Sequence, residues 1–406
     1  MKPGADEKFI SDFKRKNLEK LAKEVLKTKG ICDHCIGRQF AQLSTGMSNS
    51  ERGGLVRELL KKQKNRGKCP VCNGFFAGVG RTAEKIVKSL KGVEWKTFVV
   101  GTIAGPESVE REESLWERTG IEFCEPMKSE VNRELGKAIE KLTGKLADEK
   151  APDVTFTLEL DTGMISARTS PLLFYGEYQK LVRGIPQSKW DKYEVSVEDI
   201  MAEPFMKAAK AAGHAIHAAG REDIDARCLG WRPFILEIYG PKVRSLDIKA
   251  LENAVNSDKR IKIRGLKASR KAEIAKLKSM RADKSYRALA EFSRPLKGLK
   301  KLSGMAGVIS QQTPTRVKHR RADKMRKRRL KAIQWKKAGP QKLELLIRGE
   351  AGLYIKELVT GDSGRTKPSV AEVLGNPAKV LELDVIEIHV PGHSGKKGRE
   401  KGKTGK

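Results

Sequence analysis

Residues 220–227 read Gly220-Arg221-Glu222-Asp223-Ile224-Asp225-Ala226-Arg227, shortly before the strand-like run Pro233-Phe234-Ile235-Leu236-Glu237-Ile238. A carboxylate in a turn, flanked by arginines and braced by a strand, can stay ionised beside a polyanionic substrate. Taken alone the pattern is weak, because runs of charged residues are usually solvated faces. The rest of the chain must therefore decide whether Asp223 carries chemistry.

The charge balance points to a polyanionic partner. The 406 residues include 83 Lys+Arg against 51 Asp+Glu, a formal net charge of +32. This excess favours nucleic acid, with an anionic membrane surface well behind. The first residues lack an apolar signal core, and no run of about 18 apolar residues occurs, so we expect neither a leader peptide nor a membrane span.

Four of the six cysteines form two close pairs, Cys32-Asp33-His34-Cys35 and Cys69-Pro70-Val71-Cys72. Two such pairs supply four thiolates, the tetrahedral set that suits a structural zinc ion. The 33 residues between the pairs exceed the usual spacing of a zinc ribbon, so we expect an inserted helix. Buried thiols or a redox pair are the alternative, and His34 could replace one thiolate. Without a signal peptide, this cysteine usage indicates a reducing compartment, the cytoplasm.

The hydrophobic periodicity predicts an α+β pattern rather than repeated βαβ units. Helices are expected over about 7–29, 50–63, 128–146, 248–256 and 266–280. Strands are expected near 97–100, 154–160, 233–238, 285–291, 342–348 and 380–390. Neither G-x-G-x-x-G after a strand nor G-x-x-x-x-G-K-[ST] occurs, which removes the two commonest nucleotide-binding motifs.

The same pass divides the chain into four parts. We expect a helical zinc-binding module over 1–77, an α/β module over 78–200 and an α+β domain over 201–393. Residues 394–406 hold six basic residues and four glycines, and we expect a disordered basic tail there.

Several further segments follow one another in a specific order. They are Lys284-Ser285-Tyr286-Arg287-Ala288, Gln312-Thr313-Pro314-Thr315-Arg316-Val317-Lys318-His319-Arg320-Arg321, Gly352-Leu353-Tyr354-Ile355-Lys356-Glu357-Leu358 and Gly361-Asp362-Ser363-Gly364-Arg365-Thr366. Shorter matches are Gly37-Arg38-Gln39-Phe40, Leu181-Val182-Arg183-Gly184-Ile185-Pro186-Gln187 and Leu381-Glu382-Leu383-Asp384-Val385. With residues 220–227, this set resembles the pseudouridine synthase superfamily. It is most similar to the archaeal and eukaryotic tRNA pseudouridine synthase family with a zinc-bearing, THUMP-containing N-terminal region.

The resemblance covers nearly the whole chain except the last dozen residues. Two departures concern substrate positioning. The turn at residues 229–233 looks one residue shorter than the family's usual loop, and Leu353 stands where the family usually has Thr.

The resemblance implies a mixed-sheet pseudouridine synthase catalytic domain with an N-terminal accessory region, in which residues 78–200 contain the THUMP module. The implied reaction is an isomerisation: the bond between uracil and ribose breaks, and the base turns and rejoins through carbon, without an organic cofactor. The implied substrate is tRNA, at uridine 55 of the T-loop with uridine 54 as a second candidate. We expect a cytoplasmic monomer that does not bind membranes.

Two other functions compete with this interpretation. A noncatalytic tRNA-binding or chaperone protein of the same fold would share every feature except the need for Asp223. Another THUMP-bearing enzyme, such as a methyltransferase or thiolation enzyme, lacks its glycine-rich loop or S-G-G-x-D-S motif here.

The resemblance also assigns roles to residues of the catalytic domain. Asp223 matches the essential aspartate, which attacks the anomeric carbon or takes a proton from C2′. Lys356 matches the basic residue that pairs with this aspartate, and Tyr286 matches the tyrosine that stacks on the target uracil. We expect a structural or hydrogen-bonding role for Asp225.

Other residues are expected around the substrate. Tyr354, Ile355 and Leu383 match positions that line the family's pocket, and would otherwise be ordinary strand core residues. Arg221 could hold a phosphate near the target nucleotide, because a guanidinium matches phosphate oxygens in a bidentate way, or it could brace the turn.

Residues 316–337 carry twelve Lys and Arg and one acid, Asp323. So many like charges repel one another unless RNA neutralises them, which favours an RNA-binding surface over a solvated helix face. The corresponding stretch of the family grips RNA. The candidates are Arg316, Arg320, Arg321, Arg326, Arg328 and Arg329.

Overall fold

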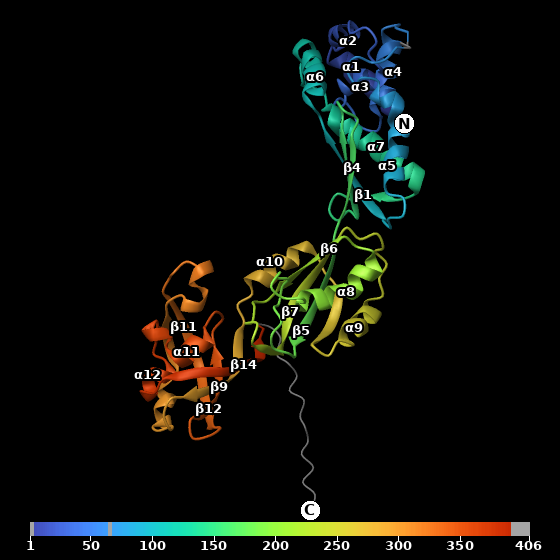
Figure 1. The fold of residues 1–406 in the computed structure, drawn as a ribbon. Helices are drawn as coiled ribbons and strands as arrows, with labels where there is room; N and C mark the ends of the chain where they lie inside the picture. Colours follow the sequence, from blue (N-terminus) through green and yellow to red (C-terminus); the bar gives the residue numbers. More distant parts are fainter. Residues whose placement is uncertain (1–3, 64–66, 391–406) are drawn as a thin grey trace, which may run out of the picture. The chain divides into compact units, whose positions relative to one another are not determined.

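The computed structural model describes residues 4–63 and 67–390, which belong to two units, Met1–Ser170 and Pro171–Lys406 (Figure 1). The expected basic tail, 394–406, lies outside the described residues. Among the residues that are described, no helix is both long enough and apolar enough to cross a membrane.

The N-terminal unit begins with a group of short helices. Its helices are α1 (Ala5–Arg15), α2 (Glu19–Leu26), α3 (Asp33–Arg38), α4 (Asn49–Leu59), the 3-10 turn η1 (Phe75–Gly78), α5 (Val79–Ser89), α6 (Pro106–Thr119) and α7 (Met127–Thr143). The helix expected over 7–29 is two helices, because Asn17 adopts a φ of 52° between them. The helix expected between the cysteine pairs is α4, capped by Ser48, whose hydroxyl accepts a hydrogen bond from the Glu51 N–H at 3.2 Å.

A four-stranded sheet follows in the order β2-β1-β3-β4. Its strands are β1 (Thr97–Ile103), β2 (Leu146–Ala147), β3 (Val154–Glu159) and β4 (Ile165–Thr169). One hydrophobic core runs from Phe9 in α1 to Leu158 in β3 and includes three of the paired cysteines. The N-terminal helices and this sheet therefore share a core, and no separate module ends at the expected boundary of residue 77.

The C-terminal unit is built on a ten-stranded sheet. Its strands are β5 (Leu172–Lys180), β6 (Gly213–Ala218), β7 (Arg227–Tyr239), β8 (Ile261–Ala268), β9 (Asp283–Phe292), β10 (Gly307–Gln311), β11 (Arg326–Lys337), β12 (Lys342–Gly349), β13 (Thr366–Lys367) and β14 (Ala378–His389). The main order is β13-β10-β11-β12-β9-β14-β7-β5-β8, with β6 paired to β7. Because β5 pairs with β7 and β8, the boundary expected at residue 200 moves to residue 170.

Short helices connect these strands. They are α8 (Val197–Ala209), α9 (Ile248–Asn256), α10 (Lys271–Ser279), η2 (Leu299–Met305), η3 (Thr315–Arg320), α11 (Ile355–Thr360), η4 (Asp362–Gly364) and α12 (Val370–Leu374). The helix expected over 266–280 is shorter, because β8 continues to Ala268. Ile355 begins a helix rather than a strand, and most of the basic stretch forms strand β11 rather than a helix face. The sheet is mixed and the fold is α+β, as the sequence predicts.

Candidate active site and metal centre

One cleft of about 910 Å³ in the C-terminal unit brings most of the candidate residues together. Its lining includes the loop from Gly220 to Ala226, which joins β6 to β7. Candidate residues in the lining are Arg221, Asp223, Tyr286, Arg316, Arg321, Arg328, Tyr354, Ile355, Lys356 and Leu383. Residues that are up to 162 positions apart in the chain therefore face a single space.

Asp223 lies in a turn that forms part of this lining. The Ala226 N–H donates to the Asp223 carbonyl at 3.0 Å, so the segment is a turn rather than an extended strand. The Arg316 guanidinium lies 2.9 Å from Asp223 Oδ1, and Lys356 Nζ lies 3.5 Å from Asp223 Oδ2. The nearer cation is therefore Arg316, which the sequence placed among the RNA-binding arginines, and Lys356 is the second.

Arg316 is held in place from its other side. Its Nε donates to Glu357 Oε1 at 2.7 Å, and Glu357 is a buried residue of α11. Burial opposes the charge of Arg316, but the hydrogen bond to Glu357 and the charge of Asp223 together raise its pKa above the ordinary value. Arg316 therefore remains a cation at any working pH.

Lys356 makes its shorter contacts to Asp225, with Nζ at 2.8 and 2.7 Å from the two carboxylate oxygens. Burial opposes the charge of Asp225, but the Lys356 ammonium outweighs it and lowers the pKa of this carboxyl. The Asp225 carbonyl also accepts a hydrogen bond from Arg183 at 2.9 Å. Lys356 thus ties the loop to α11, and Arg183 ties it to the segment that follows β5, which fits the hydrogen-bonding role expected for Asp225.

The loop that bears Asp223 packs on buried polar side chains that the sequence interpretation missed. These are Tyr178, Lys180, Glu222 and Arg232, here called the floor of the cleft. Lys180 Nζ donates to the carbonyl oxygens of Ile185, Asp223 and Ile224, each at 3.1 Å. Burial lowers the pKa of Lys180. The sequence could have indicated that Lys180 is buried, because it lies on the same face of β5 as the buried residues Phe174 and Tyr178.

Glu222 is the carboxylate of this floor. Arg232 Nη2 lies 3.1 Å from its Oε2, Lys180 Nζ lies 3.9 Å from its Oε1, and the Tyr178 hydroxyl donates to it at 3.2 Å. Gln187 donates to the Tyr178 hydroxyl at 2.7 Å and to the Gly220 carbonyl at 3.0 Å. Hydrogen bonds from these side chains thus hold the backbone around Asp223 in place.

Tyr286 stands on β9, paired with Ile347 of β12 and Val385 of β14. Burial raises the pKa of its phenol to about 12, so the ring is neutral at working pH. Tyr354 accepts a hydrogen bond on its hydroxyl from Arg321 at 2.8 Å. Ile355 and Leu383 are buried in the cleft wall. The site therefore offers neutral aromatic and apolar surface beside its charges.

Arg221 lines the cleft and also contacts the neighbouring loop, with Nη2 donating to the Ser188 hydroxyl at 3.1 Å. Along β11 the side chains alternate, so Arg326 and Arg328 are half-buried while Arg329 is exposed on the opposite face. The six arginines therefore do not form one continuous surface. The side chain of Arg320 lies outside the described part of the chain.

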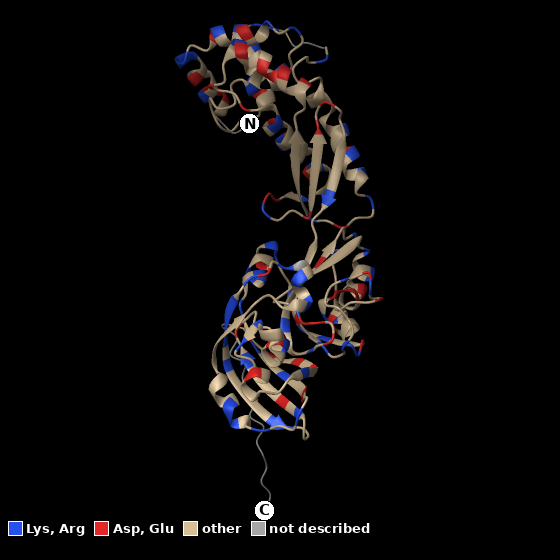
Figure 2. Cartoon of the chain, turned by 60° about the vertical axis from the view of Figure 1, so that its left-hand side comes forward, with Lys and Arg blue, Asp and Glu red and all other residues tan. Residues whose placement is uncertain are grey.

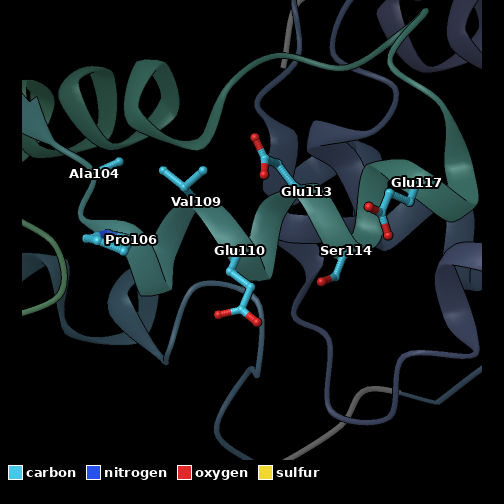
Figure 3. Close-up of a pocket in the computed structure, with 7 residues that line it drawn as sticks. All are labelled: Ala104, Pro106, Val109, Glu110, Glu113, Ser114 and Glu117. Atoms are coloured by element: carbon cyan, nitrogen blue, oxygen red, sulfur yellow. The ribbon is translucent and has the colours of Figure 1, made fainter.

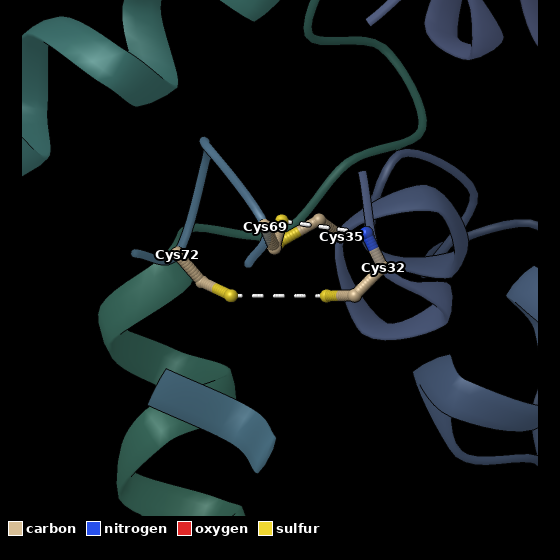
Figure 4. Close-up of side chains that lie close together, drawn as sticks. All are labelled: Cys32, Cys35, Cys69 and Cys72. Atoms are coloured by element: carbon tan, nitrogen blue, oxygen red, sulfur yellow. Dashed lines mark hydrogen bonds between the residues drawn. The ribbon is translucent and has the colours of Figure 1, made fainter. Parts of the chain in front are cut away.

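The N-terminal unit holds a cluster of four cysteines, Cys32, Cys35, Cys69 and Cys72, whose sulfurs all lie within 4.8 Å of one another (Figure 4). Cys32 Sγ and Cys72 Sγ are 3.7 Å apart. A tetrahedral zinc ion with bonds of about 2.3 Å places its sulfurs ~3.8 Å apart, so this set can hold one metal ion. His34 is engaged elsewhere, because Nδ1 lies 2.8 Å from Glu130 and its ring stacks on Phe76.

A second hollow, of about 650 Å³, runs along α6 in the N-terminal unit and presents Glu110, Glu113 and Glu117 (Figure 3). Three carboxylates along one helix face repel phosphates, so this hollow does not suit an RNA backbone. Figure 2 shows Lys and Arg on both units, interspersed with acidic residues on the N-terminal helices. The excess of positive charge is thus spread over the protein.

Comparisons with known proteins agree with the domain families expected from the sequence. Residues 173–389 match the family described as "Pus10, C-terminal", and residues 82–159 match "Pus10 THUMP domain, archaeal". The tRNA pseudouridine synthase Pus10 of Methanothrix thermoacetophila is 37% identical, over 90% of this chain and 93% of the relative. The protein of the same name from Thermofilum pendens is 35% identical, over 93% of this chain and 98% of the relative.

Solved structures are less similar. A crystal structure of a Cbf5-Nop10-Gar1 complex is 16% identical with a TM-score of 0.30, over 51% of this chain and 47% of that chain, too low to support an argument. The two domain matches and the relatives that cover most of the chain are sufficient to assign the family. The chain belongs to the Pus10 family and is an isomerase, a pseudouridine synthase.

Proposed function

We propose that this enzyme converts uridine to pseudouridine in the T-loop of tRNA, at position 55 with position 54 as a second candidate. The curated relatives are named tRNA pseudouridine synthases, which supports tRNA as the substrate. The net charge of +32 and the THUMP match support binding of a long RNA. The protein works as a cytoplasmic monomer in this proposal.

The observation that carries the proposal is the position of Asp223 between Arg316 and Lys356 in a cleft that also contains Tyr286. Asp223 acts in its ionised form, either by attacking the anomeric carbon of the ribose or by taking a proton from C2′. Two fixed cations within 3.5 Å of its oxygens orient the carboxylate. Carboxylates perform related nucleophilic chemistry at glycosidic carbons in glycosidases.

Tyr286 accepts the target base in this proposal. A uridine inside folded tRNA must leave its stack before a carboxylate can reach its ribose. Stacking on an aromatic ring is worth ~1–3 kcal/mol per base and offsets part of that loss. Tyr354, Ile355 and Leu383 enclose the base, and Arg221, Arg321 and Arg328 at the same cleft meet the backbone.

The four cysteines hold a structural Zn²⁺ in this proposal. A closed set of four thiolates leaves no open position for a substrate, so the ion stabilises the fold and takes no part in the isomerisation. The cysteines belong to the hydrophobic core of the N-terminal unit or pack against it, which fits that role.

The test is pseudouridine mapping on an unmodified tRNA transcript. Wild-type protein should form pseudouridine, and transcripts with cytidine at position 54 or 55 should identify the target. Asp223→Asn should bind the same tRNA without product, whereas Asp258→Asn, in a surface turn outside the cleft, should remain active. Binding by wild-type protein with no product at any uridine would favour the noncatalytic tRNA chaperone.

A further inference from the structure

Lys284 is a cleft residue to which the proposed chemistry assigns no part. It lies on β9 two positions before Tyr286, so the two side chains extend from the same face of the strand. Both line the cleft. Within the described chain, the Lys284 ammonium has no hydrogen-bond or ion-pair partner.

The charges around Lys284 do not balance. Lys180, Arg232 and Lys284 share one buried carboxylate, that of Glu222. Glu222 is already engaged, with Arg232 at 3.1 Å and Lys180 at 3.9 Å. No second carboxylate reaches the ammonium of Lys284 among the residues that the structure describes. The floor of the cleft therefore carries an excess of positive charge.

The ammonium also lies against the start of the loop that bears Asp223. Gly220 adopts a left-handed φ of 82°, and a Cβ at this position would lie 3.0 Å from Lys284 Nζ and 3.3 Å from Arg232 Nη1. The absence of a side chain at Gly220 lets the loop pack close to both cations. Lys284 thus lies beside the start of the loop, on the same strand as Tyr286, and lines the cleft that a target nucleotide would enter.

Lys284 is half-buried, and an unpaired ammonium that is partly withdrawn from water is unfavourable. Burial, and then the like charge of Arg232, lower the pKa of Lys284 to about 8. A bound anion would remove this penalty, and an RNA substrate brings one phosphate with each nucleotide. A uracil carbonyl would accept a hydrogen bond but would leave the excess charge uncompensated.

We propose that Lys284 binds a backbone phosphate of the nucleotide whose uracil stacks on Tyr286. The proposal rests on the proposed function for its RNA substrate. It makes Lys284 a substrate-binding residue that recognises the nucleotide after the base has left its stack. Arg232, which lines the same cleft, adds to the positive potential at this position.

The test uses tRNA joined from synthetic segments, with a single uncharged methylphosphonate linkage on the 5′ or the 3′ side of the target uridine. The Lys284→Met variant should lower kcat/KM on ordinary tRNA by about 10- to 100-fold. For wild-type protein, one of the two uncharged linkages should lower kcat/KM by a similar factor. That same linkage should have no further effect on K284M, because the variant has already lost the contact.

Controls separate binding from folding. Lys262→Met removes one exposed charge from β8 outside the cleft, and its response to the uncharged linkages should match that of wild-type protein. The thermal midpoint of K284M should be at or above that of wild-type protein, since the substitution removes an unpaired, half-buried charge. If K284M does not fold, Lys284→Gln should show the same kinetic pattern.

Two results would overturn the proposal. One is an unchanged kcat/KM in both K284M and K284Q. The other is that each uncharged linkage lowers kcat/KM of K284M by the same factor as that of wild-type protein. Dissociation constants for the same RNAs are measured in parallel. A wild-type protein that forms no pseudouridine would contradict the proposed function, while the dissociation constants would still show whether Lys284 senses a phosphate.

Discussion

The guanidinium of Arg316 bridges two carboxylates, with Nη1 at 2.9 Å from Asp223 Oδ1 and Nε at 2.7 Å from Glu357 Oε1. Glu357 is a buried residue of α11. Arg316 therefore links that helix to the proposed catalytic carboxylate, Asp223. Lys356 precedes Glu357 in the same helix, and its Nζ lies 3.5 Å from Asp223 Oδ2 but only 2.7 Å from Asp225 Oδ2. The two cations therefore have different roles in the cleft.

This difference predicts unequal effects of removing each cation. Arg316→Met should lower the single-turnover rate at saturating tRNA by about 10- to 100-fold, the effect of losing one charge-assisted hydrogen bond. Lys356→Met should lower it less, because Arg316 still faces Asp223. Arg329→Met removes an arginine from the opposite face of β11 and should leave the saturated rate unchanged. A larger loss in K356M than in R316M would contradict this assignment.

The buried lysine beneath the loop predicts a large effect on stability. Lys180→Met leaves three carbonyl oxygens without their donor and leaves Glu222 with less compensation. We expect a loss of ~3–5 kcal/mol in the free energy of unfolding, measured by denaturant titration. The double variant Lys180→Met with Glu222→Gln should lose less than the sum of the two single variants. Additive losses would mean that the two groups do not interact.

The lowered pKa of Lys284 predicts how stability depends on pH. The pKa falls from 10.5 to about 8 on folding, chiefly through burial and also through Arg232, with Cys228 and Glu222 acting in the opposite direction. Between these values the unfolded chain binds a proton that the folded chain does not, so the wild-type protein gains stability as pH rises through this range. K284M lacks this group, so it should exceed wild-type stability by about 3 kcal/mol at pH 7.

The measurement is the unfolding free energy of both proteins from pH 6 to pH 11. The difference should be constant below about pH 8 and should close as pH approaches about 10.5. A difference that stays the same across this range would mean that Lys284 is not desolvated in the folded protein.

The cysteine cluster predicts one zinc ion per chain by elemental analysis. X-ray absorption should show four sulfur neighbours at about 2.3 Å. Replacing Cys32 and Cys35 by Ser should remove the metal and destabilise the N-terminal unit, because the four cysteines belong to its core or pack against it. Cys124→Ser, outside the four-sulfur cluster, should retain the metal. A fully folded protein without metal would contradict a structural role for zinc.

Local patterns were sufficient to predict much of the fold. The strands expected near 233–238, 285–291 and 342–348 lie within β7, β9 and β12. They could be predicted because an alternating or continuous run of apolar residues indicates a strand with one or both faces buried. The domain boundary at residue 170 could not be found in this way. It depends on the pairing of β5 with β7 and β8, which are distant in sequence.

The same limit applies to the cleft. The motifs made Asp223, Tyr286 and Lys356 candidates. The contact of Arg316 with Asp223 joins residues 93 positions apart, and nothing local to either residue indicates it. Lys284 stands in the same short motif as Tyr286, yet its importance depends on how many carboxylates surround it. Such a balance of buried charges exists only in the folded protein.

Pseudouridine mapping of one unmodified tRNA, incubated with wild-type protein and with Asp223→Asn, tests the central claim most directly. We predict pseudouridine in the T-loop with the wild-type protein, and tRNA binding without product in the variant. Product formation by D223N at the wild-type rate would contradict the assignment of this carboxylate to catalysis.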